Sequence, residues 1–92
     1  MSSNIMTLPE YIQLLNYSDY RNKDTFRTVL KVGMVVLLWS EKDCASIFDA
    51  SRSSVNSWVS GRTAPHTVMR KLVFRELLLG AREKYIIHLR GH

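Results

Sequence analysis

The sequence contains a single cysteine, Cys44, among its 92 residues. One cysteine excludes an intramolecular disulfide framework and any zinc site built from several cysteines. The longest apolar run, from Val32 to Trp39, is far too short to cross a membrane as a helix. The first residues lack the basic and then apolar regions of a signal peptide. These absences predict a cytoplasmic protein.

Motifs that carry catalytic chemistry are also missing. The sequence has no nucleophile elbow, no phosphate-binding glycine loop and no metalloprotease helix motif. His88 and His92 stand four residues apart, but only Glu83 lies near them as a further ligand, which is a weak basis for a metal site. We therefore expect no enzyme activity, no cofactor and no bound metal.

The composition is that of one globular domain spanning residues 1–92. Hydrophobic residues make up 46% of the chain and charged residues 23%, so it has enough apolar side chains for a core. The net charge of +5 is unevenly spread, because residues 61–92 carry seven basic and two acidic groups. A basic region attracts polyanions, so nucleic acid and an anionic membrane are both compatible with this charge.

The segment 40–61 has the pattern of two short helices joined by a tight turn. Ser40 is placed to cap the first helix, and Ser51 is placed to cap the second. Gly61 is expected to end the second helix, because glycine takes the left-handed conformation without strain. The residues predicted to face inward are Cys44, Ala45, Phe48, Val55, Trp58 and Val59.

This spacing resembles the helix-turn-helix of the phage repressor and Cro-type (XRE-like) DNA-binding proteins. In that family a small residue lies in the first helix, an aliphatic residue follows ten positions later and an aromatic residue three beyond that. The corresponding residues here are Ala45, Val55 and Trp58, and the family's later glycine, basic residue and proline match Gly61, Arg62 and Pro65. Two positions depart from the family: Asp49 stands where a turn glycine is usual, and Glu41 where many relatives have a glutamine that touches phosphate.

The resemblance implies an all-α fold, a compact bundle of about five helices. It also implies a sequence-specific regulator of transcription, a nucleoid-associated repressor that binds double-stranded DNA as a homodimer on an inverted repeat. The residues expected at base edges are Arg52, Ser53, Asn56 and Ser57. Those expected at phosphates are Ser51, Ser54, Arg62, Thr63, Arg70 and Lys71.

The flanking segments also have helical patterns. A helix begins after Thr7, with Glu10 completing a capping box, and a longer one runs from Lys23 or Asp24 through the apolar residues up to Leu37. Gly33 lies on the apolar face of that longer helix, which predicts the close approach of a neighbouring backbone. The residues expected to be buried include Leu8, Tyr11, Ile12, Leu15, Phe26, Val29, Leu30, Val36 and Leu37.

A further helix is predicted from His66 to Leu79, with Gly80 as its natural stop. Its expected core residues are Val68, Leu72, Val73 and Leu79, and its expected exposed residues are Arg70, Lys71 and Arg75. Beyond it, the segment 81–92 is compatible with either helix or strand. Its apolar patch either folds back onto the helix that ends near Trp39 or forms a dimer interface. The patch consists of Tyr85, Ile86, Ile87 and Leu89.

Two other classes of function stay open at this level. One is an antitoxin or adaptor that uses its helix-turn-helix mainly to grip another small protein. The other is a peripheral membrane protein that uses the basic amphipathic stretch 68–79, although the motif in segment 40–61 favours DNA over a membrane.

Overall fold

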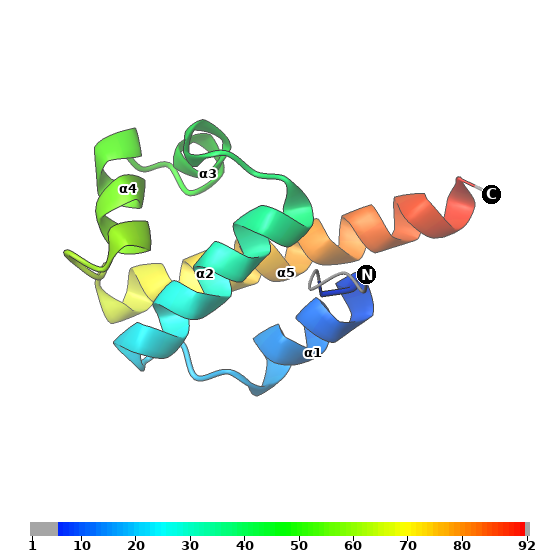
Figure 1. Cartoon of the computed structure of the whole chain (residues 1–92), viewed down its shortest axis with the longest axis horizontal. Coiled ribbons are helices and arrows are strands. Elements are labelled where there is room, and N and C mark those ends of the chain that lie inside the picture. Colours follow the sequence, from blue (N-terminus) through cyan, green and yellow to red (C-terminus); the bar gives the residue numbers. More distant parts are fainter. Residues whose placement is uncertain (1–5, 92) are drawn as a thin grey trace, which may run out of the picture.

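The computed structural model describes residues 6–91, and these form five helices without a strand (Figure 1). The expected all-α fold class is therefore confirmed. In chain order the helices are α1 (Leu8–Tyr17), α2 (Lys23–Leu37), α3 (Glu41–Ile47), α4 (Arg52–Ser60) and α5 (Thr67–Arg90).

Side-chain caps fix where the short helices begin. The Thr7 hydroxyl accepts from the Glu10 amide and the Glu10 carboxylate accepts from the Thr7 amide, which is the predicted capping box. Ser40 and Asp43 form the same reciprocal pair at the start of α3. The hydrogen bond from the Ser40 amide is the main reason that the pKa of Asp43 is lowered. The local sequence at each cap thus determines where α1 and α3 begin.

The core is built around α2, which packs against α1, α4 and α5 (Figure 1). The Phe26 ring of α2 stacks on Phe74 of α5, with ring centroids 6.1 Å apart, and meets the edge of Trp58 of α4 at 6.4 Å. Aromatic pairs in such arrangements contribute about 0.5–1.5 kcal/mol beyond their buried area. One residue of α2 thereby ties α4 to the longest helix of the fold.

Gly33 makes room for a side chain rather than for a backbone. A Cβ at this position would overlap the hydroxyl of Tyr11 and would lie 2.9 Å from a Leu77 methyl group. The Tyr11 hydroxyl is fully buried and donates to the Val29 carbonyl over 2.8 Å, and burial raises the pKa of that tyrosine. Close approach at Gly33 is confirmed, whereas the expectation of a backbone neighbour is wrong.

The last helix does not stop at Gly80. Helix α5 runs through it to Arg90, so the segment after Gly80 is helical and is not a separate element. Gly80 is needed for packing instead, because a Cβ there would lie 2.6 Å from the indole of Trp39. Glycine in a helix interior costs about 1 kcal/mol relative to alanine, and here this cost admits a large aromatic ring.

The orientation expected for the first half of α5 is also wrong. Val68, Leu72 and Leu79 are 75%, 40% and 47% exposed, and of the four predicted core residues only Val73 is buried. The residues of α5 that face the core are Arg70, Val73, Phe74, Leu77 and Ala81. Because this helix has apolar residues on two sides, its sequence pattern does not indicate which side is buried.

Candidate nucleic-acid interface

Helices α3 and α4 are joined by a tight connection in which Asp49 takes the left-handed conformation, with φ of 54°. Aspartate tolerates that region better than most residues do. The Ala50 amide then donates to the Ala45 carbonyl over 2.9 Å and closes the turn. Ala45, Val55 and Trp58 are all buried, as the spacing predicts. The inner faces of the two helices therefore pack together.

Burial of that inner face leaves a polar face of α4 in solvent. Arg52, Ser53 and Asn56 are exposed, and Ser57 is half-buried beside them. The helix lies at one end of the molecule, away from α1 and from the chain's C-terminus (Figure 1). The four side chains predicted to read bases thus share one accessible helix face, and their contact with DNA stays a prediction.

Two serines organise the start of α4. The Ser51 hydroxyl accepts from the Ser54 amide over 3.0 Å and donates to the Ser54 hydroxyl over 2.9 Å. The Ser54 hydroxyl accepts in this contact, so its own O–H remains available to donate a hydrogen bond. The positive end of the helix dipole lies here, so this end of α4 suits a phosphate.

A chain of polar contacts crosses the outer face of α4. The Asn56 side-chain nitrogen donates to the Glu41 carboxylate over 2.9 Å, and the Asn56 oxygen accepts from the Arg62 guanidinium over 2.7 Å. The same Arg62 nitrogen reaches the Ser57 hydroxyl at 3.4 Å. Arg62 is exposed but is directed back onto α4. No local sequence pattern indicates the Glu41 contact, because Glu41 and Asn56 lie in different helices.

Arg27 of α2 supports the other end of α4. Its Nε donates to the Val59 carbonyl over 2.9 Å, which satisfies an acceptor in the last turn of that helix. Gly61 has φ of 83° and ends α4 as predicted, and a Cβ there would lie 3.2 Å from the Arg27 guanidinium. Sequence reasoning missed this arginine, because a contact between positions 27 and 59 follows from no local pattern.

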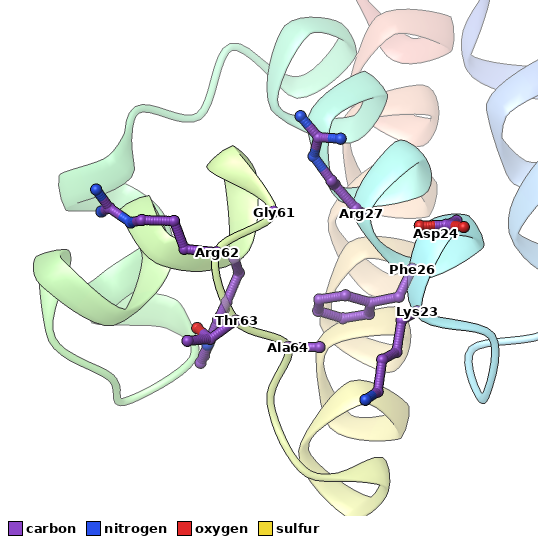
Figure 2. A pocket seen from close by; sticks show the side chains of 9 residues that line it. Lys23, Asp24, Phe26, Arg27, Gly61, Arg62, Thr63 and Ala64 are labelled. Carbon is purple, nitrogen blue, oxygen red and sulfur yellow. The ribbon is translucent and has the colours of Figure 1, made fainter.

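A cleft of about 310 Å³ lies beside these groups. Figure 2 shows Lys23, Phe26 and Arg27 of α2 on one side of it and the chain from Gly61 to Ala64 on the other, with the Arg62 side chain extending away from α2. Among the described residues, its lining includes three basic residues (Lys23, Arg27 and Arg62), the hydroxyl group of Thr63 and one acid, Asp24. Thr63 is exposed, as a phosphate contact requires. The region around the end of α4 is therefore electropositive.

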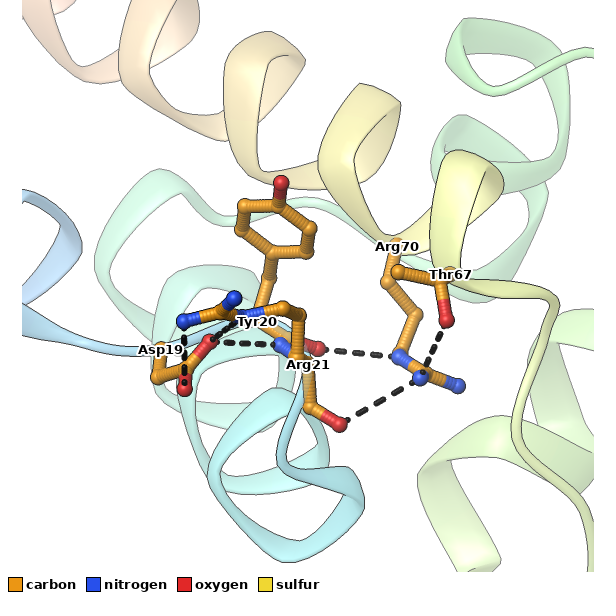
Figure 3. Close-up of polar contacts among 5 residues, drawn as sticks. All are labelled: Asp19, Tyr20, Arg21, Thr67 and Arg70. Atoms are coloured by element: carbon orange, nitrogen blue, oxygen red, sulfur yellow. Dashed lines mark hydrogen bonds and ion pairs between the residues drawn. The ribbon is translucent and has the colours of Figure 1, made fainter.

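Arg70 has a structural role, and the expectation that it is exposed and supports phosphate binding is wrong. Only 6% of it is exposed. Its guanidinium donates to the Tyr20 and Arg21 carbonyls over 2.9 and 3.3 Å and to the Thr67 hydroxyl over 2.9 Å (Figure 3). It also donates to the Pro65 carbonyl. The side chain therefore ties the connection between α1 and α2 to the start of α5. Lys71, its neighbour, is exposed.

The apolar patch near the end of α5 is partly covered. Tyr85 is half-buried, and Lys84 beside it donates to the Val36 carbonyl over 3.3 Å, so this part of the helix packs back against α2. Ile86, Ile87 and Leu89 are exposed by 49%, 61% and 57%. One side of this part of α5 thus packs back against α2, and a dimer interface on the exposed side stays a prediction.

Metal-ligating side chains do not gather among residues 6–91, where no group of three or more histidine, cysteine or acidic residues could hold an ion. His92, one half of the weak histidine pair, lies outside the described residues. In the same part of the chain, none of the helices has the length and apolarity needed to cross a membrane.

No family model matches the chain, and the comparisons with curated proteins and with solved structures found no significant match. The roles of its residues are therefore argued from this chain's own geometry.

Proposed function

We propose that the chain is a sequence-specific double-stranded DNA-binding regulator of transcription, a repressor that inserts α4 into the major groove. The observation that carries the proposal is the outer face of α4, where Arg52, Ser53 and Asn56 are exposed while Val55 and Trp58 anchor the opposite face in the core. The major groove admits one α-helix and presents a distinct pattern of donors and acceptors for each base pair.

Each exposed group of α4 has a chemical counterpart in the groove. Arg52 suits the two acceptors of guanine, and Asn56 suits the donor and acceptor of adenine. The hydroxyl groups of Ser53 and Ser57 can pair with either kind of base edge. Phosphates are the proposed partners of the α4 start, where Ser51 and Ser54 lie, and of Thr63 beyond its end.

A two-fold pair of chains is part of the proposal, since single small domains rarely bind DNA tightly. Leu72, Leu79 and Ile86 recur every seven residues on the side of α5 opposite its core residues, and each is at least 40% exposed. Such an unpartnered apolar stripe is suited to helix pairing with a second copy. The stripe also favours the second candidate, an adaptor or antitoxin that binds another small protein.

Selection of bound duplexes from a random pool tests the proposal. We expect an inverted repeat with half-sites about one helical turn apart, bound by two chains as measured by light scattering. If no selected duplex outcompetes bulk genomic DNA, the proposal of a sequence-specific regulator is refuted. If one chain binds a site without a repeat, only the homodimer part of the proposal is refuted.

A further inference from the structure

The amide group of Asn56 is held between two charged side chains. Its nitrogen lies 2.9 Å from Glu41 Oε2, and its oxygen lies 2.7 Å from Arg62 Nη2. A carboxylate only accepts hydrogen bonds and a guanidinium only donates them. Rotation of the amide by 180° would set oxygen against carboxylate and N–H against guanidinium. The two neighbours therefore fix which end of the amide is the donor.

Both neighbours are themselves held in place. Glu41 is the first residue of α3, directly after the Ser40 cap. The Arg62 amide donates to the Ser57 carbonyl over 3.0 Å, and its guanidinium also reaches the Ser57 hydroxyl. The chain thus holds the Asn56 side chain from both ends of the α3–α4 unit before any ligand arrives.

The fixed amide keeps the hydrogen-bonding groups that adenine requires. Asn56 has two N–H donors and two lone pairs, and Glu41 and Arg62 use one of each. One N–H remains for adenine N7, and one lone pair remains for the N6 amino group. We propose that Glu41 and Arg62 are positioning residues that pre-orient Asn56 for adenine, an inference that rests on the proposed function.

Discrimination follows from the fixed orientation. Guanine presents the O6 acceptor where adenine presents an amino donor. A fixed Asn56 would meet that acceptor with its own oxygen, whereas a freely rotating amide can turn an N–H towards it. The negative charge of Glu41 opposes DNA binding in general, because the phosphates carry charge of the same sign. The geometry thus exchanges some affinity for selectivity, and Arg62 acts through Asn56 rather than on phosphate.

The test compares base preference in matched variants on the duplex selected by the intact chain. Asn56→Ala first identifies the contacted adenine, as the position at which replacing A·T by G·C no longer matters. At that position the wild-type chain should lose roughly tenfold to hundredfold affinity on the replacement. Glu41→Gln combined with Arg62→Gln leaves the net charge unchanged and should reduce that ratio to about threefold or less, because a glutamine on either side of the amide both donates and accepts.

Arg82→Gln combined with Glu83→Gln is the control, since it removes the same two kinds of charge from exposed positions of α5 and should keep the wild-type ratio. Melting curves check that Glu41→Gln/Arg62→Gln is folded, as expected because the Ser40–Asp43 capping box is untouched. A wild-type ratio in Glu41→Gln/Arg62→Gln overturns the inference and leaves the proposed function standing, and so does an Asn56→Ala variant that changes no position. A wild-type chain that prefers no duplex removes both.

Discussion

Replacing Arg70 by methionine should destabilise the fold and leave the DNA-binding face intact. The guanidinium donates four hydrogen bonds, all to neutral oxygens that belong to the α1–α2 connection and the start of α5. A hydrogen bond to a charged group contributes about 1.5–3 kcal/mol, and each buried acceptor left unpaired costs about 1–3 kcal/mol. These contributions are not additive, because the four bonds share one donor group.

Removing the buried charge offsets part of that loss, since its desolvation penalty disappears with it. We expect a net destabilisation of about 3 kcal/mol. In a domain of this size each kcal/mol lowers Tm by about 4–8 °C, so Tm should fall by about 12–24 °C. Arg70→Lys should lose roughly half as much, because an ammonium keeps the charge but cannot match the planar fork of donors.

Thermal unfolding followed by circular dichroism measures the effect, with Lys71→Met as the control. Lys71 is exposed next to Arg70, and its replacement should change stability by less than about 0.5 kcal/mol. DNA affinity measured well below Tm should be nearly unchanged in Arg70→Met. The opposite pattern, a normal Tm with a salt dependence reduced by about one phosphate contact, would refute the buried role of Arg70.

Three further perturbations separate packing, electrostatics and recognition. Gly33→Ala should destabilise the domain by about 1–3 kcal/mol in denaturant titrations, because the added methyl group overlaps the Tyr11 hydroxyl, although alanine favours helix. Unchanged stability would mean that α1 and α2 separate easily at this point. The pKa of Asp43 is lowered in the folded state, so its stabilising contribution is complete above its unfolded pKa and is lost as pH falls through the folded one. Asp43→Asn should therefore lose less stability than the wild-type chain below about pH 4. An identical acid profile in both would mean that the capping box does not cause the loss of stability in acid. Trp58→Ala should cost about 3–5 kcal/mol of stability, since only 8% of the residue is exposed. Arg52→Ala should leave Tm unchanged and cost about 1–3 kcal/mol of binding to the selected duplex. Equal unfolding in both variants would mean that α4 faces the other way.

Local signals sufficed wherever a few adjacent residues determine the structure. The Ser40–Asp43 and Thr7–Glu10 boxes, and the left-handed Gly61, follow from short patterns that satisfy helix ends. The spacing within segment 40–61 likewise predicted which side of α4 is buried.

Contacts between distant segments could not be predicted in the same way. Arg70 meets carbonyl groups some fifty positions earlier in the chain, and Glu41 meets Asn56 across two helices. Leu38 takes the left-handed conformation at the end of α2 with φ of 58°, where no glycine marks the stop. Tertiary packing decides each of these, because the energy of the neighbouring element outweighs the local preference.

The orientation of α5 shows how two apolar stripes mislead. Val73 and Leu77 face the core, while Leu72 and Leu79 lie towards solvent, and the spacing within each pair is helical. Periodicity cannot rank two such stripes. The burial of Arg70 on the core side depends on the Tyr20 and Arg21 carbonyls, which lie about fifty positions away and could not be predicted from the helix alone.

The central claim, that the outer face of α4 reads duplex DNA, is tested most directly by fluorescence anisotropy with the selected duplex and a scrambled one across a series of salt concentrations. The account predicts that affinity for both falls steeply with salt, by roughly a thousandfold or more between about 50 and 200 mM if six or more phosphates are contacted. It also predicts that the preference for the selected duplex persists throughout and is reduced by about 1–3 kcal/mol in Arg52→Ala. Equal affinity for the two duplexes at every salt concentration, or a preference that Arg52→Ala retains in full, would contradict it.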